Sequence, residues 1–305
     1  MSINDEILNL CAENGFVKSG FCKTSPTEKQ FPNTAFLVCA VPYVNDTCHK
    51  KPEKLLEYGI IAPFARFNYY KETVRRLKKI AGFLRAKYGG KKSDYRIFCN
   101  SRINEKKLAL SAGIGYLGIN NLIITKESGS RIILAAMLMP DYLALDFSLD
   151  LKDAKNDFLS CSVCKENPAC VSACRSGALG VDGKINLQNC IQWYAGGNAR
   201  GKNVPFHVAA NWGNVFYGCT KCQDVCPYNK KEMVQDSGTK QVGIKTNLGA
   251  LDAFVDVSEF IKLSDDQIRT KFRGTALGLS WLTPDTLRRN ALMCLSKKSS
   301  TTADR

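Results

Sequence analysis

The chain has 305 residues, of which 45% are apolar and 23% charged, a composition that excludes a largely disordered protein. Its first residues lack the basic and apolar parts of an export signal, and its longest apolar run, 132–140, is far shorter than the roughly 20 residues of a membrane-spanning helix. We therefore expect neither a secreted precursor nor a membrane partner, and we expect a cytoplasmic location.

The first elements along the chain are short apolar runs rich in β-branched residues, which predict buried strands. These runs are TAFLVCAVPYV (34–44), DYRIFC (94–99), NLIIT (121–125) and RIILAAMLM (131–139). Between the first two, YYKETVRRLKKIAGFLRAKYGG (69–90) predicts an amphipathic helix with a basic outer face, ended by Gly89 and Gly90. Its apolar positions, spaced by three and four residues, are Val74, Leu77, Ala81, Leu84 and Tyr88.

The last part of the chain carries two helix signals, SDDQIRTKF (264–272) and TPDTLRRNALMCL (283–295). Three regions follow from the whole pattern. We expect a mixed region of strands and helices at 1–154, a cysteine-rich region at 155–232 and a helical region at 233–305. The predicted fold class is α+β.

The formal net charge of +15 indicates a basic protein. If eight cysteines are thiolates around two iron–sulfur cores of about +2 each, the net charge becomes about +11. Lys and Arg neutralise the phosphates of nucleic acids, so RNA is a candidate partner. An ordinary basic surface is the alternative.

Eight of the fourteen cysteines follow spacings that are typical of metal ligands. Two-cluster bacterial ferredoxins use a C-x2-C-x2-C-x3-C-P run, in which the fourth cysteine ligates the other cluster. The first run here has a longer middle gap and Arg175 in place of the proline, whereas the second run keeps the proline as Pro227. The two runs are Cys161-x2-Cys164-x5-Cys170-x3-Cys174 and Cys219-x2-Cys222-x3-Cys226.

Thiolates with few imidazoles suit either iron–sulfur clusters or zinc. One four-cysteine zinc site could use the two C-x2-C pairs, but it would leave Cys170, Cys174 and Cys226 without a role. Two [4Fe–4S] clusters use eight cysteines, and Cys190 in NCIQWYAGG is the natural eighth. We favour two clusters, which carry single electrons.

The remaining cysteines lack ligand spacing, and we expect them to be buried or incidental. They are Cys11, Cys22, Cys39, Cys48, Cys99 and Cys294.

The order of the first cysteine run, CIQWYA and YGCTKCQDVCPYN resembles the epoxyqueuosine reductases, cobalamin-dependent iron–sulfur enzymes that complete queuosine in tRNA, and the related cobalamin domains of reductive dehalogenases. Upstream, FARFNYYKE (64–72) is similar to the family's Y-A-R-G-R-D-Y-H. The segment 99–124 is similar to D-S-A-P-V-x-E followed by A-G-L-G-W-x-G-K-N, with Ile119 in place of the lysine. ESGSRIILAAML and FRGTALGLSWLTPDTLRRNAL extend the resemblance, which covers residues 30–293.

The resemblance implies a nitroreductase-like cobalamin-binding domain at 1–154 and a bacterial ferredoxin-like domain with two [4Fe–4S] clusters at 155–232. It implies a short helical C-terminal region at 233–305. The family continues after this region into helical repeats that help to hold tRNA, and we expect that full helical-repeat domain to be absent here.

The resemblance also assigns the ligands crosswise between two clusters. Cluster 1 takes Cys161, Cys164, Cys170 and Cys226, and cluster 2 takes Cys174, Cys190, Cys219 and Cys222. An external low-potential donor would supply electrons, which pass through the clusters to reduce cobalamin to Co(I) for attack on an electrophile. We expect base-off cobalamin without a histidine ligand, and His49 and His207 as ordinary residues. The implied cobalamin-binding positions are Arg66, Tyr70, Asn100, Ser101, Gly118, Asn120, Gly129 and Ser130.

The family's proton donor, the aspartate of D-S-A-P, is Asn100 in this chain. A neutral amide is a poor acid near neutral pH, so Glu105 or Tyr70 would have to supply the proton. We therefore keep three alternatives to an epoxyqueuosine reductase. They are a reductive-dehalogenase-like enzyme with a substrate other than tRNA, an electron-transfer protein that reduces a separate corrinoid protein, and a zinc-stabilised RNA-binding module.

Overall fold

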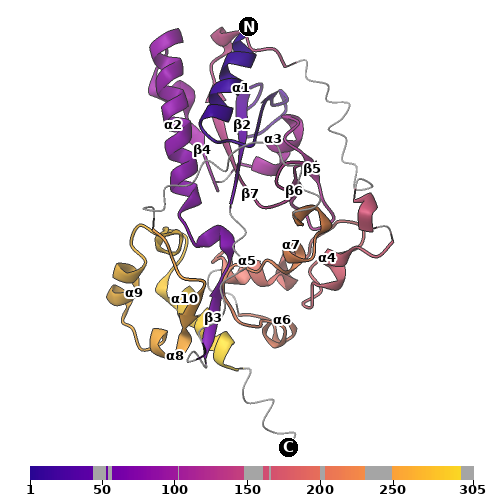
Figure 1. The fold of residues 1–305 in the computed structure, drawn as a ribbon, viewed down its shortest axis with the longest axis vertical. Coiled ribbons are helices and arrows are strands. Elements are labelled where there is room, and N and C mark those ends of the chain that lie inside the picture. The colour runs from indigo at the N-terminus through magenta and orange to yellow at the C-terminus, as the bar shows by residue number, and fades with distance from the viewer. Residues whose placement is uncertain are drawn as a thin grey trace, which may run out of the picture. The chain divides into compact units, whose positions relative to one another are not determined.

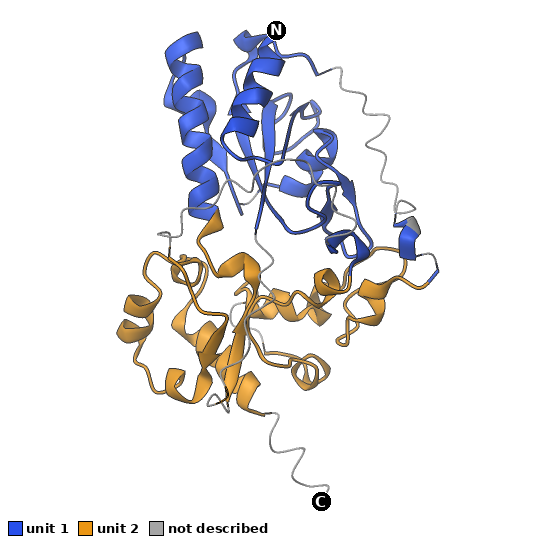
Figure 2. Cartoon of the chain, viewed as in Figure 1, with its two compact units in different colours: residues 1–43, 70–166, 226–244 blue, residues 44–69, 167–225, 245–305 orange. Residues whose placement is uncertain are grey.

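The structure is a computed structural model, which describes residues 1–43, 53, 57–101, 103–147, 161–164, 166–199, 203–230 and 249–296. The chain divides into two compact units, which Figure 2 colours separately. Unit 1 is formed by residues 1–43, 70–166 and 226–244, and unit 2 by 44–69, 167–225 and 245–305. Each unit combines segments from different predicted regions, so the boundaries at 154 and 232 stay predictions.

Unit 1 is built on an antiparallel sheet with the strand order β1-β2-β7-β4 (Figure 1). In the register, Phe21 pairs with Leu37, and Cys39 pairs with Ala135. The strands are β1 (Lys18–Lys23), β2 (Ala35–Pro42), β7 (Ile132–Met139) and β4 (Ile97–Phe98). Strands β2 and β7 confirm two of the predicted strands.

Helices cover both faces of this sheet, which explains why β2 is apolar along almost its whole length. Side chains of α1 (Ile3–Glu13) and α2 (Tyr69–Tyr88) pack on one face, with Leu37 and Cys39 of β2. Side chains of α3 (Glu105–Ser111) pack on the other face, with Phe36 and Val38. A strand that is buried on both faces loses the alternation of apolar and polar residues.

Helix α2 confirms the predicted amphipathic helix and ends where Gly89 and Gly90 take left-handed φ values of 84° and 97°. Leu77, Ala81 and Leu84 are buried as predicted, and Tyr88 also packs against the core. The buried face further contains an ion pair between Glu72 and Arg76, at 2.9 Å. Apolar periodicity could not predict these two charged residues.

The other two predicted strands are much shorter than their apolar runs. In the run 94–99, Tyr95 ends a 3-10 turn (Lys92–Tyr95), which leaves only β4 in the sheet. In the run 121–125, Asn121 has a left-handed φ of 58°, and only β6 (Ile123–Ile124) is extended. It pairs with β5 (Tyr116–Leu117) in a separate two-stranded sheet.

Unit 2 holds a second sheet with the order β8-β3-β9. Strand β3 (Tyr58–Ile61) pairs in parallel with β8 (Val215–Tyr217) and antiparallel with β9 (Phe254–Asp256). Phe216, Phe260 and Phe272 form its aromatic core, with the first two rings 4.8 Å apart. The helices of unit 2 are α4 (Ala169–Ser172), α5 (Ile191–Ala195), α6 (Phe206–Ala210), α7 (Lys221–Asp224), α8 (Val257–Phe260), α9 (Asp265–Lys271) and α10 (Pro284–Leu295).

Helices α9 and α10 confirm the two helix signals in the last part of the chain. Ser264 and Gln267 form a capping box on α9, and the side chain of Thr283 caps α10 just before Pro284. The described residues therefore contain the predicted mixture of helices and strands. Among those residues, no helix is both long and apolar enough to span a bilayer.

Candidate functional site

The four cysteines of predicted cluster 2 lie in unit 2, where short helices and loops present them. Cys174 follows α4, Cys190 is the N-cap of α5, Cys219 follows β8, and Cys222 lies in α7. Burial raises the pKa of the Cys222 thiol, and the thiols of Cys219, Cys190, Cys170 and Cys174 raise it further. The structure thus brings the four thiols within electrostatic reach of one another.

The segments that carry Cys190 and Cys219 are joined by two amide side chains. Gln192, on α5, accepts a hydrogen bond from the backbone N–H of Cys219 at 2.9 Å. Asn290, fully buried on α10, donates to the carbonyl oxygens of Ala195 and Phe216 at 3.1 and 2.9 Å. Because Asn290 contacts the last residue of α5 and the middle residue of β8, it fixes the spacing of two cysteine-bearing segments.

Backbone N–H groups face the sulfur atoms of this set. Burial raises the pKa of Cys190, and the N–H groups of Trp193 and Gln192 partly offset that rise. Burial also raises the pKa of Cys219 to about 11, again against a backbone N–H donor. Cys174 accepts a bond of 3.3 Å from the N–H of Ala178. Such donors stabilise thiolates and tune the potential of iron–sulfur clusters.

Three cysteines of predicted cluster 1 belong to unit 1. Burial raises the pKa of Cys226, and the nearby thiols of Cys161 and Cys164 raise it too. Burial likewise raises the pKa of Cys161, and the backbone N–H of Ile119 acts in the opposite direction. The fourth member, Cys170, is buried on α4 of unit 2.

The segment after Cys226 is anchored by the predicted Gly129–Ser130 pair. Asn229 accepts a hydrogen bond from the backbone N–H of Ser130 at 2.8 Å and donates to its hydroxyl at 3.0 Å. Gly129 has a φ of 57°, and a Cβ there would lie 2.3 Å from the carbonyl oxygen of Tyr228. These two predicted cofactor residues therefore support the loop that carries Cys226.

Among the described residues, no three His, Cys, Asp or Glu side chains converge closely enough to hold a single metal ion. The thiols raise one another's pKa values without reaching that tight arrangement. His207 is exposed on α6 and contacts Asn189 at 3.0 Å, and His49 lies outside the described residues. Of the six remaining cysteines, Cys11, Cys22 and Cys39 are buried as predicted; Cys99 and Cys294 are partly buried, and Cys48 lies outside the described residues.

The loop before α3 carries the residue at the family's aspartate position. Asn100 is exposed and takes a left-handed φ of 50°, a conformation that asparagine tolerates better than most residues. The next residue, Ser101, is also exposed. Glu105, in the first turn of α3, accepts hydrogen bonds from the backbone N–H and the hydroxyl of Ser101, at 3.1 and 3.4 Å.

The turn at 118–122 lies beside α3 in unit 1. Lys106 donates to the carbonyl and side-chain oxygens of Asn121, both at 3.1 Å. Asn120 is buried, and among the described residues its side-chain nitrogen has no hydrogen-bond partner. At Gly118, a Cβ would lie 2.5 Å from the Cδ1 atom of Ile124, so a larger residue there would displace the side chain of Ile124. This turn also supplies the N–H of Ile119 that faces Cys161.

Two further predicted cofactor residues flank the start of α2. Arg66 is buried in unit 2, and its Nε donates to the carbonyl oxygen of Ile61 at 3.1 Å. Tyr70 is half-buried in the first turn of α2, in unit 1. Arg66 therefore has a structural role within its own unit.

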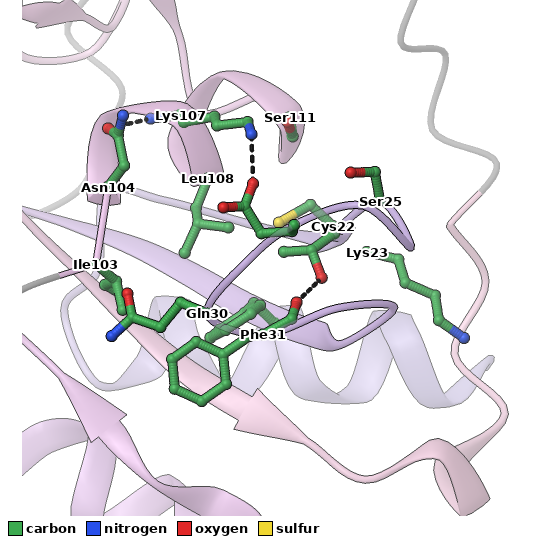
Figure 3. Close-up of a pocket in the computed structure, with 13 residues that line it drawn as sticks. Cys22, Lys23, Ser25, Gln30, Phe31, Ile103, Asn104, Lys107, Leu108 and Ser111 are labelled. Atoms are coloured by element: carbon green, nitrogen blue, oxygen red, sulfur yellow. Dashed lines mark hydrogen bonds and ion pairs between the residues drawn. The ribbon is translucent and has the colours of Figure 1, made fainter.

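A pocket of about 230 Å³ lies in unit 1 between α3 and the segment after β1 (Figure 3). An ion pair between Lys107 and Glu28 links its two sides. Its apolar lining includes Phe31, Phe36 and Leu108. Sequence analysis missed this pocket because its residues come from separate segments without a motif, and it contains none of the predicted site residues.

Comparisons with known proteins agree with the resemblance in the sequence. No protein-family model matches the chain. An epoxyqueuosine reductase of Francisella cf. novicida is 28% identical over 220 residues, which cover 70% of this chain and 58% of that protein. The chain spans about half the length of the curated relatives that it matches, from 40% to 58% in three of them.

Solved structures show the same fold. The structure of epoxyqueuosine reductase from Streptococcus thermophilus matches with a TM-score of 0.73 and 20% identity, over 98% of this chain and 82% of that one. An epoxyqueuosine reductase with an epoxyqueuosine-modified tRNA stem loop matches with a TM-score of 0.70 and 21% identity, over 96% and 80%. By its sequence matches and its fold, the chain is thus a relative of the epoxyqueuosine reductases.

Proposed function

We propose that the chain is a reductase of the epoxyqueuosine reductase type, which uses two [4Fe–4S] clusters and cobalamin to reduce an epoxyqueuosine-modified tRNA. The observation that carries this proposal is the grouping in unit 2 of Cys174, Cys190, Cys219 and Cys222, with Cys170 near Cys222 as well. A structural zinc site would not need the further thiols of Cys161, Cys164 and Cys226, which interact with one another in unit 1.

The donor set fits iron–sulfur clusters. Thiolates are the usual ligands of these clusters, and backbone N–H groups face several of the sulfur atoms. Bound clusters supply single-electron steps, for which an external low-potential donor is needed. The protein's own part is to position the cysteine ligands. Asn290 and Gln192 hold the segments that carry Cys190 and Cys219, and Asn229 supports the loop that carries Cys226.

The residues of unit 1 also fit a large polar cofactor. The unpartnered side-chain nitrogen of Asn120 is a buried donor that a cofactor could satisfy, and buried donors rarely stay unpaired. Asn100 and Ser101 present further polar groups at the surface. When bound and reduced to Co(I), cobalamin supplies a strong nucleophile or electron donor. Asn100, Ser101 and Asn120 are the residues that would hold it.

A tRNA substrate is supported by the relative that was solved with an epoxyqueuosine-modified stem loop. The net charge of +15 provides the sequence-independent attraction to phosphates. Helix α2 contributes a row of exposed basic residues in unit 1, formed by Lys71, Arg75, Lys78, Lys79 and Arg85.

Asn100 favours a second candidate, in which the same cofactors reduce a different electrophile. A general acid contributes about 10²- to 10⁴-fold to the rate, so its loss at this position argues for a substrate that needs no proton from residue 100. A protein that binds clusters but no cobalamin would instead be an electron carrier.

Anaerobic reconstitution followed by two assays tests the proposal. Cobalamin is first titrated into the cluster-loaded protein and followed by its visible absorbance. An epoxyqueuosine-modified stem loop and a low-potential reductant are then added, and queuosine is measured by mass spectrometry. We expect cobalamin uptake and queuosine formation, and loss of product in Cys222→Ala. Clusters without cobalamin uptake would contradict the reductase and favour the electron carrier.

A further inference from the structure

The loop before α3 contains a carboxyl group that is linked to the surface through one hydroxyl. Glu105 is partly buried, and its Oε1 lies 3.4 Å from the Oγ of the exposed Ser101. The same oxygen accepts the backbone N–H of Ser101 at 3.1 Å, which fixes the carboxyl against the loop. A protonated carboxyl in this position would donate to the serine oxygen.

Ser101 has the hydrogen-bonding capacity to relay a proton. Its Oγ already faces the backbone N–H of Ile103 at 3.5 Å. A serine oxygen has two lone pairs and one hydrogen, so it can accept from Ile103 and from protonated Glu105 and still donate outwards. The outward direction is open because Ser101 and its neighbour Asn100 are both exposed.

Burial keeps Glu105 protonated at higher pH than an ordinary glutamate. It raises the pKa of this carboxyl to about 7, against the opposing hydrogen bonds from Ser101 and Asn100. The neighbouring ionisable group is the thiol of Cys99, whose pKa is itself raised by burial and by the charge of Glu105. An acid that titrates near the working pH is well suited to proton transfer.

We propose that Glu105, acting through the hydroxyl of Ser101, supplies the proton that Asn100 cannot give to the oxygen of the opening epoxide. This inference rests on the proposed function and names the proton source for it. Lys106, the next residue of α3, is directed elsewhere, because its ammonium group donates to Asn121.

The proposed step balances as follows. A carbon–oxygen bond of the epoxide breaks, and its electron pair moves to the oxygen, which takes the proton of Ser101. The carbon that loses this bond receives the two electrons that the reductant supplies. Ser101 recovers a proton from Glu105, and the resulting carboxylate is reprotonated by solvent. Complete removal of the oxygen as water consumes two protons and two electrons, and the electrons come from the external low-potential reductant.

Because Glu105 acts through another residue, the test needs a readout that a merely structural role would not change. Glu105→Gln keeps an oxygen for the N–H of Ser101 but has no acidic proton to transfer. We expect Glu105→Gln to lower turnover of the modified stem loop by about 10²-fold with unchanged cobalamin binding, and Ser101→Ala to lower turnover at least as far. Adding Asn100→Asp should restore turnover in both, because an aspartic acid returns at the exposed position.

The pH profile and a matched control complete the experiment. Turnover of the natural protein should fall as the pH rises through about 7. In the double variant Asn100→Asp with Glu105→Gln, the pH profile of turnover should no longer have a midpoint near about 7. Glu28→Gln, which breaks the ion pair with Lys107 on α3, should leave turnover unchanged.

Two failures can be told apart. If the natural protein with both cofactors forms no queuosine, the proposed function fails and the role of Glu105 falls with it. If queuosine forms at the same rate in Glu105→Gln, or if Asn100→Asp does not rescue that variant, only the role of Glu105 is overturned.

Discussion

The burial of Glu105 predicts a pH-dependent cost to the stability of unit 1. The pKa of this carboxyl rises from its usual 4.5 to about 7 in the folded protein. The folded state therefore holds a proton that the unfolded state loses as the pH rises above 4.5, so stability falls up to about pH 7 and stays lower above it. From pH 5 to pH 8 the expected loss is about 2.5 kcal/mol, at 1.36 kcal/mol per pKa unit.

Glu105→Gln should remove this dependence, because its side chain has no charge to bury. Urea unfolding of the cofactor-free, reduced protein at pH 5 and pH 8 measures the effect, followed by circular dichroism. Between pH 5 and pH 8, the free energy of unfolding of the natural protein should fall by about 2.5 kcal/mol more than that of the variant. Glu13→Gln, at the exposed last position of α1, is the matched control and should show the same difference in unfolding free energy between the two pH values as the natural protein. The same pH dependence in Glu105→Gln and the natural protein would refute the argument.

Three further predictions concern the cysteine sets. Asn290→Ala leaves two buried carbonyl oxygens without their donor, so the free energy of unfolding should fall by about 1 to 3 kcal/mol, as measured by urea unfolding. An iron assay should show that the bound iron falls by about half. Gly129→Ala places a Cβ against Tyr228, so we expect less bound iron at the cysteines around Cys226, whereas Gly113→Ala, with a similar φ but no atom within 4 Å of its Cβ, should keep the natural iron content. Equal iron contents in the two variants would contradict this argument. Cluster assembly should release protons and become more favourable as the pH rises from 7 to 9, because burial raises the pKa of the thiols. Calorimetry in two buffers measures the released protons, and cluster binding that does not depend on pH would contradict this prediction.

Local patterns predicted those parts of the fold whose signal lies within one segment. The amphipathic spacing of α2 and the capping signals of α9 and α10 gave elements that the structure confirms. Strands β3, β8 and β9 were not predicted, because three short segments far apart in the sequence form one sheet. The separation of the chain into interleaved units has no local signal either.

The candidate site likewise contains some features that local patterns predict and others that depend on distant segments. Cysteine spacing singled out the candidate ligands, because ligand spacing is a property of short loops, whereas their division between two clusters came from the family resemblance and stays a prediction. The raised pKa of Glu105 depends on what buries it, and the role of Asn290 depends on two segments that it joins across 95 and 74 positions of the sequence. Such tertiary effects are not encoded in any motif.

The iron and acid-labile sulfide content of anaerobically reconstituted protein tests the central claim most directly. Two [4Fe–4S] clusters predict about eight iron and eight sulfide per chain, and about four of each in Cys222→Ala. The account is contradicted if the protein binds zinc without sulfide, or if Cys222→Ala retains the iron content of the natural chain.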